Sequence, residues 1–217
     1  MTKSDLARAM DDVQRLLHTD FRMAGFRKHG RSYNRITADG LTQVIGFQMG
    51  SSDPPGTTYF PGLRENLYGL FSVNLGVYVP EVARYHGGSA PNSVVRDYHC
   101  CIRTRLGSAE GKQVWWQIAV DEDSIAELSQ RLENDAFPFF RQFESRNQIL
   151  DRFLKEADNT EIMAVPRIVC AIIVLQRGER ELARNLLAAQ ARDHSRTPGH
   201  PAYVVSLARK LGIEISH

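Results

Sequence analysis

The sequence predicts an α+β protein with an N-terminal helix, a mostly antiparallel sheet of about five strands, and a helical C-terminal half. Three patterns support this class. Apolar residues recur at helical spacing near the N-terminus, apolar and polar residues alternate between Arg31 and Gln117, and helical spacing returns from Asp121. With 217 residues, 42% of them hydrophobic, the chain can bury a large core. We therefore expect an α+β domain over residues 1–158 and a helical extension packed on it over 159–217.

The first helix is expected over residues 6–21. Its apolar residues form one stripe at intervals of three and four positions, namely Leu6, Met10, Val13, Leu17 and Phe21. A helix with such a stripe buries it against another layer of structure. This helix should therefore cover one face of the sheet that follows.

The first two strands are predicted to form a hairpin around Asp39-Gly40, because this pair tolerates the positive φ angles of a two-residue type I′ turn. A two-residue turn places Arg35 opposite Val44. Because side chains alternate between the two faces of a strand, Arg35 and Gln48 should then share the polar face of the hairpin.

Three further strands are expected over residues 71–78, 98–106 and 114–118. The first of these alternates without interruption between apolar and polar side chains, which is the period of a strand with one buried face. Two stretches rich in Pro and Gly, residues 51–68 and 86–92, separate the strands and are predicted to be loops.

The C-terminal half is expected to be helical from Asp121, since Asp121 and its acidic neighbours favour a helix start through the helix dipole. Three helices with apolar stripes are predicted near the C-terminus, over residues 166–177, 179–193 and 201–211. Exposed stripes of this size are unfavourable in water. These helices should therefore pack against the sheet domain or against a second copy of the chain.

Composition and charge argue against several classes of protein. A formal net charge of +2 is too small to predict nucleic-acid binding by itself. No apolar run approaches the roughly 20 residues of a membrane span, and the first residues lack the apolar core of a signal peptide. Three cysteines, two of them adjacent, do not form a disulfide framework. We therefore expect a cytoplasmic protein with reduced thiols and no membrane partner.

Three groups of residues occur in order along the chain: GFRKHG at 25–30 with Tyr33 and Arg35, FSVNLGVY at 71–78, and IRTRLG at 102–107 followed by Trp115 and Trp116. Together they resemble a bacterial family known as a domain of unknown function, numbered 4304. The resemblance extends from Leu6 to about Phe153. It implies an α+β domain in a bacterial cytosolic protein, and it implies no activity and no catalytic residues.

The polar face of the predicted sheet is the candidate binding site. Gly46 and Gly76 leave strand interiors without side chains, which marks the close approach of a ligand or of another backbone. Arginine guanidinium groups suit carboxylate or phosphate, and amide and phenol groups add hydrogen bonds. The alternative is a face that is polar only because it meets water or is covered by the C-terminal helices. The candidate residues for binding an anionic ligand or partner are Arg35, Gln48, Asn74, Tyr78, His99, Arg103 and Arg105.

Catalytic and metal signatures do not accompany these residues. His99 and Cys101 would share a strand face, but no second ligand pair such as Cys-x-x-Cys completes a metal site. Cys101 beside Arg103 would have the surroundings of a reactive thiolate, although a lone cysteine in a strand is usually a packing residue. We therefore predict no catalytic residue, no metal and no cofactor.

The predicted function is that of a non-enzymatic protein-binding module in the bacterial cytoplasm, which uses the arginine-bearing face against an acidic surface of a partner protein. By analogy alone, a small immunity-like protein that neutralises a toxin fits this description. A nucleic-acid or nucleotide binder on the same face is the alternative, with Tyr33 and Tyr78 as stacking platforms. A cysteine-dependent enzyme using Cys101 or His99 is the third hypothesis.

Overall fold

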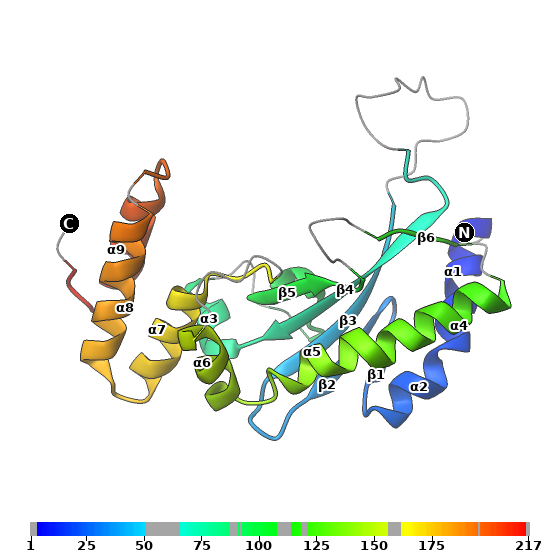
Figure 1. Cartoon of the computed structure of the whole chain (residues 1–217), viewed down its shortest axis with the longest axis horizontal. Coiled ribbons are helices and arrows are strands. Elements are labelled where there is room, and N and C mark those ends of the chain that lie inside the picture. Colours follow the sequence, from blue (N-terminus) through cyan, green and yellow to red (C-terminus); the bar gives the residue numbers. More distant parts are fainter. Residues whose placement is uncertain are drawn as a thin grey trace.

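The computed structural model describes residues 4–50, 66–86, 91, 93–107, 114–118, 121–155, 162–194 and 196–215. Within these ranges, helices pack on an antiparallel sheet, and further helices follow in the C-terminal half (Figure 1). The predicted α+β class is therefore confirmed. In the described part of the chain, no helix is long and apolar enough to cross a membrane.

Two helices, α1 (Asp5–Leu16) and α2 (His18–Met23), begin the described chain. Four residues of the predicted apolar stripe have no exposed surface, namely Met10, Val13, Leu17 and Phe21. The Phe21 ring lies 4.5 Å from the Tyr33 ring and 6.0 Å from the Phe47 ring, measured between centroids. The N-terminal helices therefore cover the sheet face to which Tyr33 and Phe47 belong.

The strands of the sheet are β1 (Arg27–His29), β2 (Ser32–Ile36), β3 (Thr42–Met49), β4 (Leu70–Tyr78), β5 (Ile102–Arg105) and β6 (Trp116–Gln117). Their order is β1-β2-β3-β4-β5, every pair is antiparallel, and β6 also pairs with β4. The apolar residues of β4 have at most 1% of their surface exposed, namely Phe71, Val73, Leu75 and Val77. The polar residues between them are buried too, with Ser72 at 0% and Asn74 at 9%, so both faces of β4 are covered.

The β2–β3 hairpin differs from the predicted one by a single residue. Arg35 pairs with Gln43 instead of Val44, so the loop has three residues instead of two. Its last residue, Gly40, has a φ of 76°, as the left-handed position of a three-residue hairpin loop requires. Because side chains alternate along a strand, this one residue places Arg35 on the helix-covered face, opposite to Gln48.

The strand predicted over residues 98–106 is shorter in the structure. Residues Asp97–His99 form a 3₁₀ turn, η1, and β5 begins only at Ile102. His99 therefore does not belong to the sheet, although Arg103 and Arg105 do.

A second group of helices follows the sheet in the chain. The helices α4 (Glu122–Arg131) and α5 (Phe137–Arg141) are joined by a π-helical turn, η2 (Leu132–Ala136). The side-chain amide of Gln43 donates a hydrogen bond to the backbone oxygen of Phe140 at 3.0 Å. Helix α5 therefore packs on the same sheet face as α2.

The remaining helices lie at one end of the sheet, on the left in Figure 1. They are α3 (Pro80–Tyr85), α6 (Arg146–Lys155), α7 (Pro166–Gln176), α8 (Arg180–Asp193) and α9 (His200–Lys210). Helix α7 packs against both α3 and α6. Helix α8 packs against α7 and against α9, its neighbours in the sequence. The buried residues of the sheet and of these helices form one hydrophobic cluster. The C-terminal helices therefore do not cover the polar sheet face.

Candidate binding site on the outer sheet face

The sheet face opposite to α2 and α5 is called the outer face here, and it carries most of the predicted site. Asn74 of β4 pairs with Gly46 and with Arg105, and Gly76 pairs with Arg103. Residues that pair directly across strands point to the same face. Five of the seven predicted residues therefore share the outer face, namely Gln48, Asn74, Tyr78, Arg103 and Arg105.

Arg35 is not part of this site, which corrects the prediction. Its Nε donates a hydrogen bond to Gln43 Oε1 at 2.8 Å, and its guanidinium also reaches the backbone oxygen of Ala24 and the carboxylate of Glu144, each at 3.2 Å. The guanidinium lies 5.2 Å from the centre of the Phe26 ring. Arg35 therefore joins the hairpin to the helical layer, and the three-residue loop is the reason.

Residues 93–101, which we call the strap, cross the outer face. The Arg96 guanidinium donates to Ser32 Oγ of β2 at 2.9 Å, and Asp97 Oδ2 accepts from Asn74 Nδ2 of β4 at 3.0 Å. The strap is thus fixed to strands on both sides of β3. His99, the sixth predicted residue on this side of the sheet, is held above the strands by the strap.

The two glycines in the strand interiors make room for the strap. A Cβ atom at Gly76 would lie 2.6 Å from Cys100 Sγ, and one at Gly46 would lie 3.0 Å from Asp97 Oδ1. At Gly76 the distance is too short for a side chain to be added without movement of Cys100, whereas at Gly46 a small adjustment of the Asp97 side chain would suffice. Of the two explanations for these glycines, a ligand or another backbone, the structure supports the second.

A hydrogen-bonded network occupies the middle of the outer face. Arg105 Nε donates to Asn74 Oδ1 at 3.1 Å, and Asn74 Nδ2 donates to Gln48 Oε1 at 2.9 Å as well as to Asp97. The Arg105 guanidinium lies 5.2 Å from the centre of the Trp115 ring. Burial lowers the pKa of Arg105, whereas the charge of Asp97 acts in the opposite direction. Arg105 is therefore a cation held in one place, next to an acidic group.

Asp97 and Trp115 are members of this network that sequence reasoning missed. Asp97 lies outside any strand, so strand alternation could not assign it to a face. The sequence indicated the position of Asp97 only indirectly. Gly46 and Gly76 predicted that another backbone or a ligand approaches the strands, but not which segment it is.

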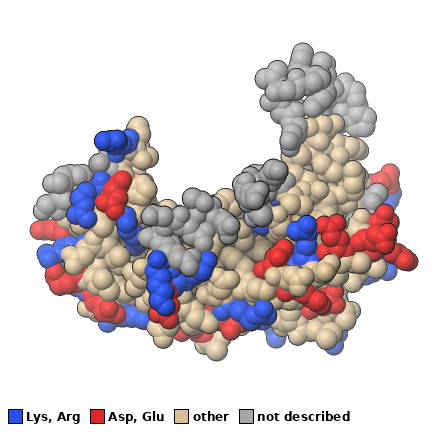
Figure 2. All heavy atoms as spheres, viewed as in Figure 1, with Lys and Arg blue, Asp and Glu red and all other residues tan. Residues whose placement is uncertain are grey.

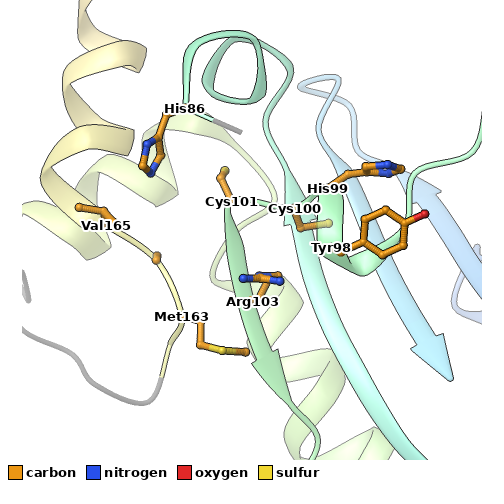
Figure 3. Close-up of a pocket in the computed structure, with 9 residues that line it drawn as sticks. His86, Tyr98, His99, Cys100, Cys101, Arg103, Met163 and Val165 are labelled. Carbon is orange, nitrogen blue, oxygen red and sulfur yellow. The ribbon is translucent and has the colours of Figure 1, made fainter. Parts of the chain in front are cut away.

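A cavity of about 370 Å³ lies beside Arg103, at the β5 edge of the outer face (Figure 3). Figure 3 shows Arg103 between Cys101 and Met163, with Tyr98 and His99 on one side and His86 on the other. The cavity walls come from four places, namely the residue after α3, the strap, β5 and the segment 163–165. No carboxylate is among the described residues that line it.

The backbone of Arg103 is fixed on both sides. Its N–H donates to the Met163 oxygen at 3.1 Å and its oxygen accepts from the Met163 N–H at 2.7 Å, so residue 163 extends the sheet by one bridge. The Nε atom of Arg103 is buried and has no hydrogen-bond partner among the described residues. A buried guanidinium N–H without an acceptor is unfavourable, and because this Nε is itself covered, an acceptor from the cavity reaches it only if the Arg103 side chain shifts. The guanidinium is nevertheless part of the cavity lining, where it can meet an acceptor from outside.

Two histidines line the cavity, His86 and His99. His99 Nδ1 accepts a hydrogen bond from the Arg96 backbone N–H at 3.0 Å, so the neutral ring carries its proton on Nε2. His86 Nδ1 is hydrogen-bonded to the Tyr203 hydroxyl of α9. Burial lowers the pKa of His86, and the nearby His200 lowers it further. Arg103 is therefore the permanent positive charge of the lining.

The thiols of this region are held in the protonated form. Burial raises the pKa of Cys101 to about 12 and raises the pKa of Cys100 well above its ordinary value. A reactive thiolate requires the opposite shift. Among the residues that the structure describes, no three His, Cys, Asp or Glu side chains gather in a way that could hold a metal ion.

Comparison with known families adds one finding. Residues 64–142 match the model of the family DUF4304, described as a domain of unknown function, and this range contains β4, the strap and β5. The match is shorter than the predicted resemblance, which ran from Leu6 to about Phe153. No curated protein and no solved structure matches the chain. The predicted resemblance is thus confirmed, and the chain is similar to DUF4304 over β4, the strap and β5, whereas β2, β3 and residue 163 lie outside the match.

Proposed function

We propose that this chain is a non-enzymatic protein-binding module of the bacterial cytoplasm, and that it binds an acidic surface of a partner protein through the outer face and the strap. The observation that carries the proposal is the grouping of Tyr98, Arg103, Arg105 and Trp115 around one side of the sheet. Tyr98 is 65% exposed although it is a large aromatic residue. Tyr, Trp and Arg are the residue types that most often dominate binding energy at protein interfaces.

The rigidity of this surface favours binding. Arg105 is held by Asn74 and by the Trp115 ring, and the strap that carries Tyr98 is hydrogen-bonded to β2 and β4. A side chain that is already ordered loses less conformational entropy when a partner docks. An immunity-like role against a toxin would be one form of this function.

The nucleic-acid alternative loses one of its two stacking platforms. Tyr33 has no exposed surface, its hydroxyl donates to the backbone oxygen of Gln14 at 3.1 Å, and burial raises its pKa to about 12. Figure 2 shows Asp and Glu gathered over α4, and Lys and Arg elsewhere interspersed with acidic residues. A single-strand binder combines a basic groove with several accessible rings. The burial of Tyr33 therefore favours a protein partner.

The cysteine-enzyme alternative is disfavoured by the thiols themselves. A nucleophilic cysteine acts as a thiolate, and burial keeps Cys101 protonated at neutral pH. Three unpaired cysteines, Cys100, Cys101 and Cys170, also support a reducing compartment.

Photo-crosslinking in the cells from which the chain comes tests the proposal. Benzoylphenylalanine replaces Tyr98 in one variant and Met23 in a matched control, because Met23 on α2 is 82% exposed and lies away from the outer face. We expect discrete protein adducts from position 98 alone, and their loss when Arg105→Gln is added. Equal adducts from both positions would contradict the proposal, and adducts to nucleic acid at position 98 would favour the alternative.

A further inference from the structure

We propose that the cavity beside Arg103 takes a single carboxylate side chain, from an aspartate or glutamate of the partner protein. This inference rests on the proposed function and gives it a specific anchor point. It follows from the state of the Arg103 guanidinium, from the charge of the cavity lining, and from the size and rim of the cavity.

The guanidinium of Arg103 has an N–H group that lacks a hydrogen-bond acceptor in the described part of the chain. Its Nε is buried and has no acceptor among the described residues, while arginine remains charged at every physiological pH. A carboxylate accepts two parallel hydrogen bonds from a guanidinium, and such a charge-assisted pair is stronger than a neutral hydrogen bond. A docked carboxylate would therefore pair with a guanidinium whose Nε finds no acceptor among the described residues.

The described lining of the cavity contains no carboxylate. Burial holds the Cys101 thiol protonated and therefore uncharged. The strap contributes His99, whose Nε2 carries the proton of the neutral ring. A negative group in the cavity is therefore attracted by Arg103, and this attraction is partly opposed by Asp97 and Glu81, whose charges act on the thiols of Cys100 and Cys101.

The size of the cavity suits a side chain better than a nucleotide. At about 370 Å³ it lies near the lower end of the roughly 300–1,000 Å³ range of small-molecule pockets. Two of the residues that line it keep exposed surface, Tyr98 at 65% and Met163 at 54%. These side chains can pack against the methylene stem of a glutamate and against the surface around it. The backbones of Met163 and Arg103 are hydrogen-bonded to each other, so the Met163 part of the lining stays next to the residue that carries the positive charge.

The test uses a blocked glutamate, N-acetyl-glutamate α-methylamide, whose single charge is the side-chain carboxylate. It is titrated into the full chain while NMR follows the Arg103 Nε–H signal and the ring signals of His86 and His99. Blocked glutamine and inorganic phosphate serve as comparison probes. We expect saturable shifts with the glutamate and about tenfold weaker binding of the glutamine, because only the carboxylate forms a charge-assisted pair.

Two variants complete the experiment. Arg103→Gln should abolish the saturable histidine shifts, and Arg27→Gln, which changes an exposed arginine on β1, should leave them intact. The comparison of glutamate with glutamine on the unaltered chain does not depend on the folding of either variant. Equal binding of the two probes, or tighter binding of phosphate, would overturn the carboxylate assignment.

The outcome also separates this inference from the proposed function. If the Arg103→Gln variant still gives adducts from position 98, and the unaltered chain shows no NMR shift specific to glutamate, the carboxylate assignment is wrong. The proposed binding surface would then still be supported. The absence of adducts from position 98 in the otherwise unaltered chain would overturn the proposed function itself.

Discussion

Replacing Gly76 by alanine tests how closely the strap packs on β4. The added Cβ would lie 2.6 Å from Cys100 Sγ and 2.8 Å from Cys100 Cβ, whereas carbon atoms in protein interiors pack at about 3.5–4.0 Å. The strap must therefore move by about 1 Å or the strand must bend. Cys100 is only 6% exposed, and its thiol lies 3.5 Å from the Arg96 oxygen, so it has little freedom to move aside. Overpacking of this kind costs about 1–3 kcal/mol.

Urea unfolding of the full chain measures this cost. We expect Gly76→Ala to lower the free energy of unfolding by about 1–3 kcal/mol. Gly46→Ala is the matched control on the neighbouring strand, since its Cβ would lie 3.0 Å from Asp97 Oδ1, 3.3 Å from Cγ and 3.4 Å from Cβ, so the Asp97 side chain needs to move by only a few tenths of an ångström. Its cost should stay below about 1 kcal/mol.

A double-mutant cycle identifies the cause. Combining Gly76→Ala with Cys100→Gly removes both clashing atoms, so the two changes together should cost at least about 1 kcal/mol less than the sum of the single changes. Additive costs, or a Gly76→Ala variant as stable as the unaltered chain, would refute the packing of the strap on Gly76.

Two further predictions follow from burial and titration. Iodoacetamide should label Cys101 more slowly than a small free thiol at neutral pH, because burial raises its pKa to about 12; labelling as fast as that of a free thiol would restore the enzyme hypothesis. The pKa of His86 is lowered from 6.5 in the folded state, so the unfolded chain binds this proton first as the pH falls. The contribution of His86 to the free energy of unfolding is therefore complete above pH 6.5 and declines below it. In urea unfolding, the stability of His86→Gln should fall less steeply towards about pH 5 than that of the unaltered chain. Parallel pH profiles of the two proteins would contradict this assignment.

Features encoded by local periodicity were predicted from the sequence. The apolar stripe of α1 and α2 has a helical period, and β4 has an uninterrupted period of two, so each pattern identifies the kind of element and the face that packs in the core. The patterns do not reveal that the helix divides after Leu16 or that the polar side of β4 is buried as well. The placement of Asn74, Tyr78, Arg103 and Arg105 on one face followed from this alternation. It required no knowledge of distant contacts beyond the pairing of β4 with β5.

The error at Arg35 has a different origin. Gly40 takes a positive φ in a two-residue type I′ turn and also at the last position of a three-residue loop, so the Asp-Gly signal is the same for both. The two loops differ by one residue in register, and one residue inverts the face of every side chain on β2. Local sequence therefore located the hairpin correctly and did not determine on which face Arg35 lies.

The strap was beyond prediction because its position depends on contacts between residues far apart in the chain. Residue 97 was assigned to no strand and residues 98–99 to the start of a strand that begins only at Ile102. The packing of Asp97 and Cys100 on Gly46 and Gly76 defines where this segment lies. The glycines were a correct signal of close approach. They contain no information on which segment approaches, since any backbone or ligand could use the same space.

The strap also connects stability to binding. It brings Tyr98 and His99 beside Arg103, so the cavity exists only while the strap is seated on the two glycines. A displaced strap would leave the hydrophobic core on the other sheet face intact, because that core is formed by the helices and the apolar side of the strands. Changes that unseat the strap should therefore weaken binding more than they weaken folding. Gly76→Ala should reduce crosslinking from position 98 even at temperatures where the variant remains folded, whereas a core substitution of equal cost in stability should not.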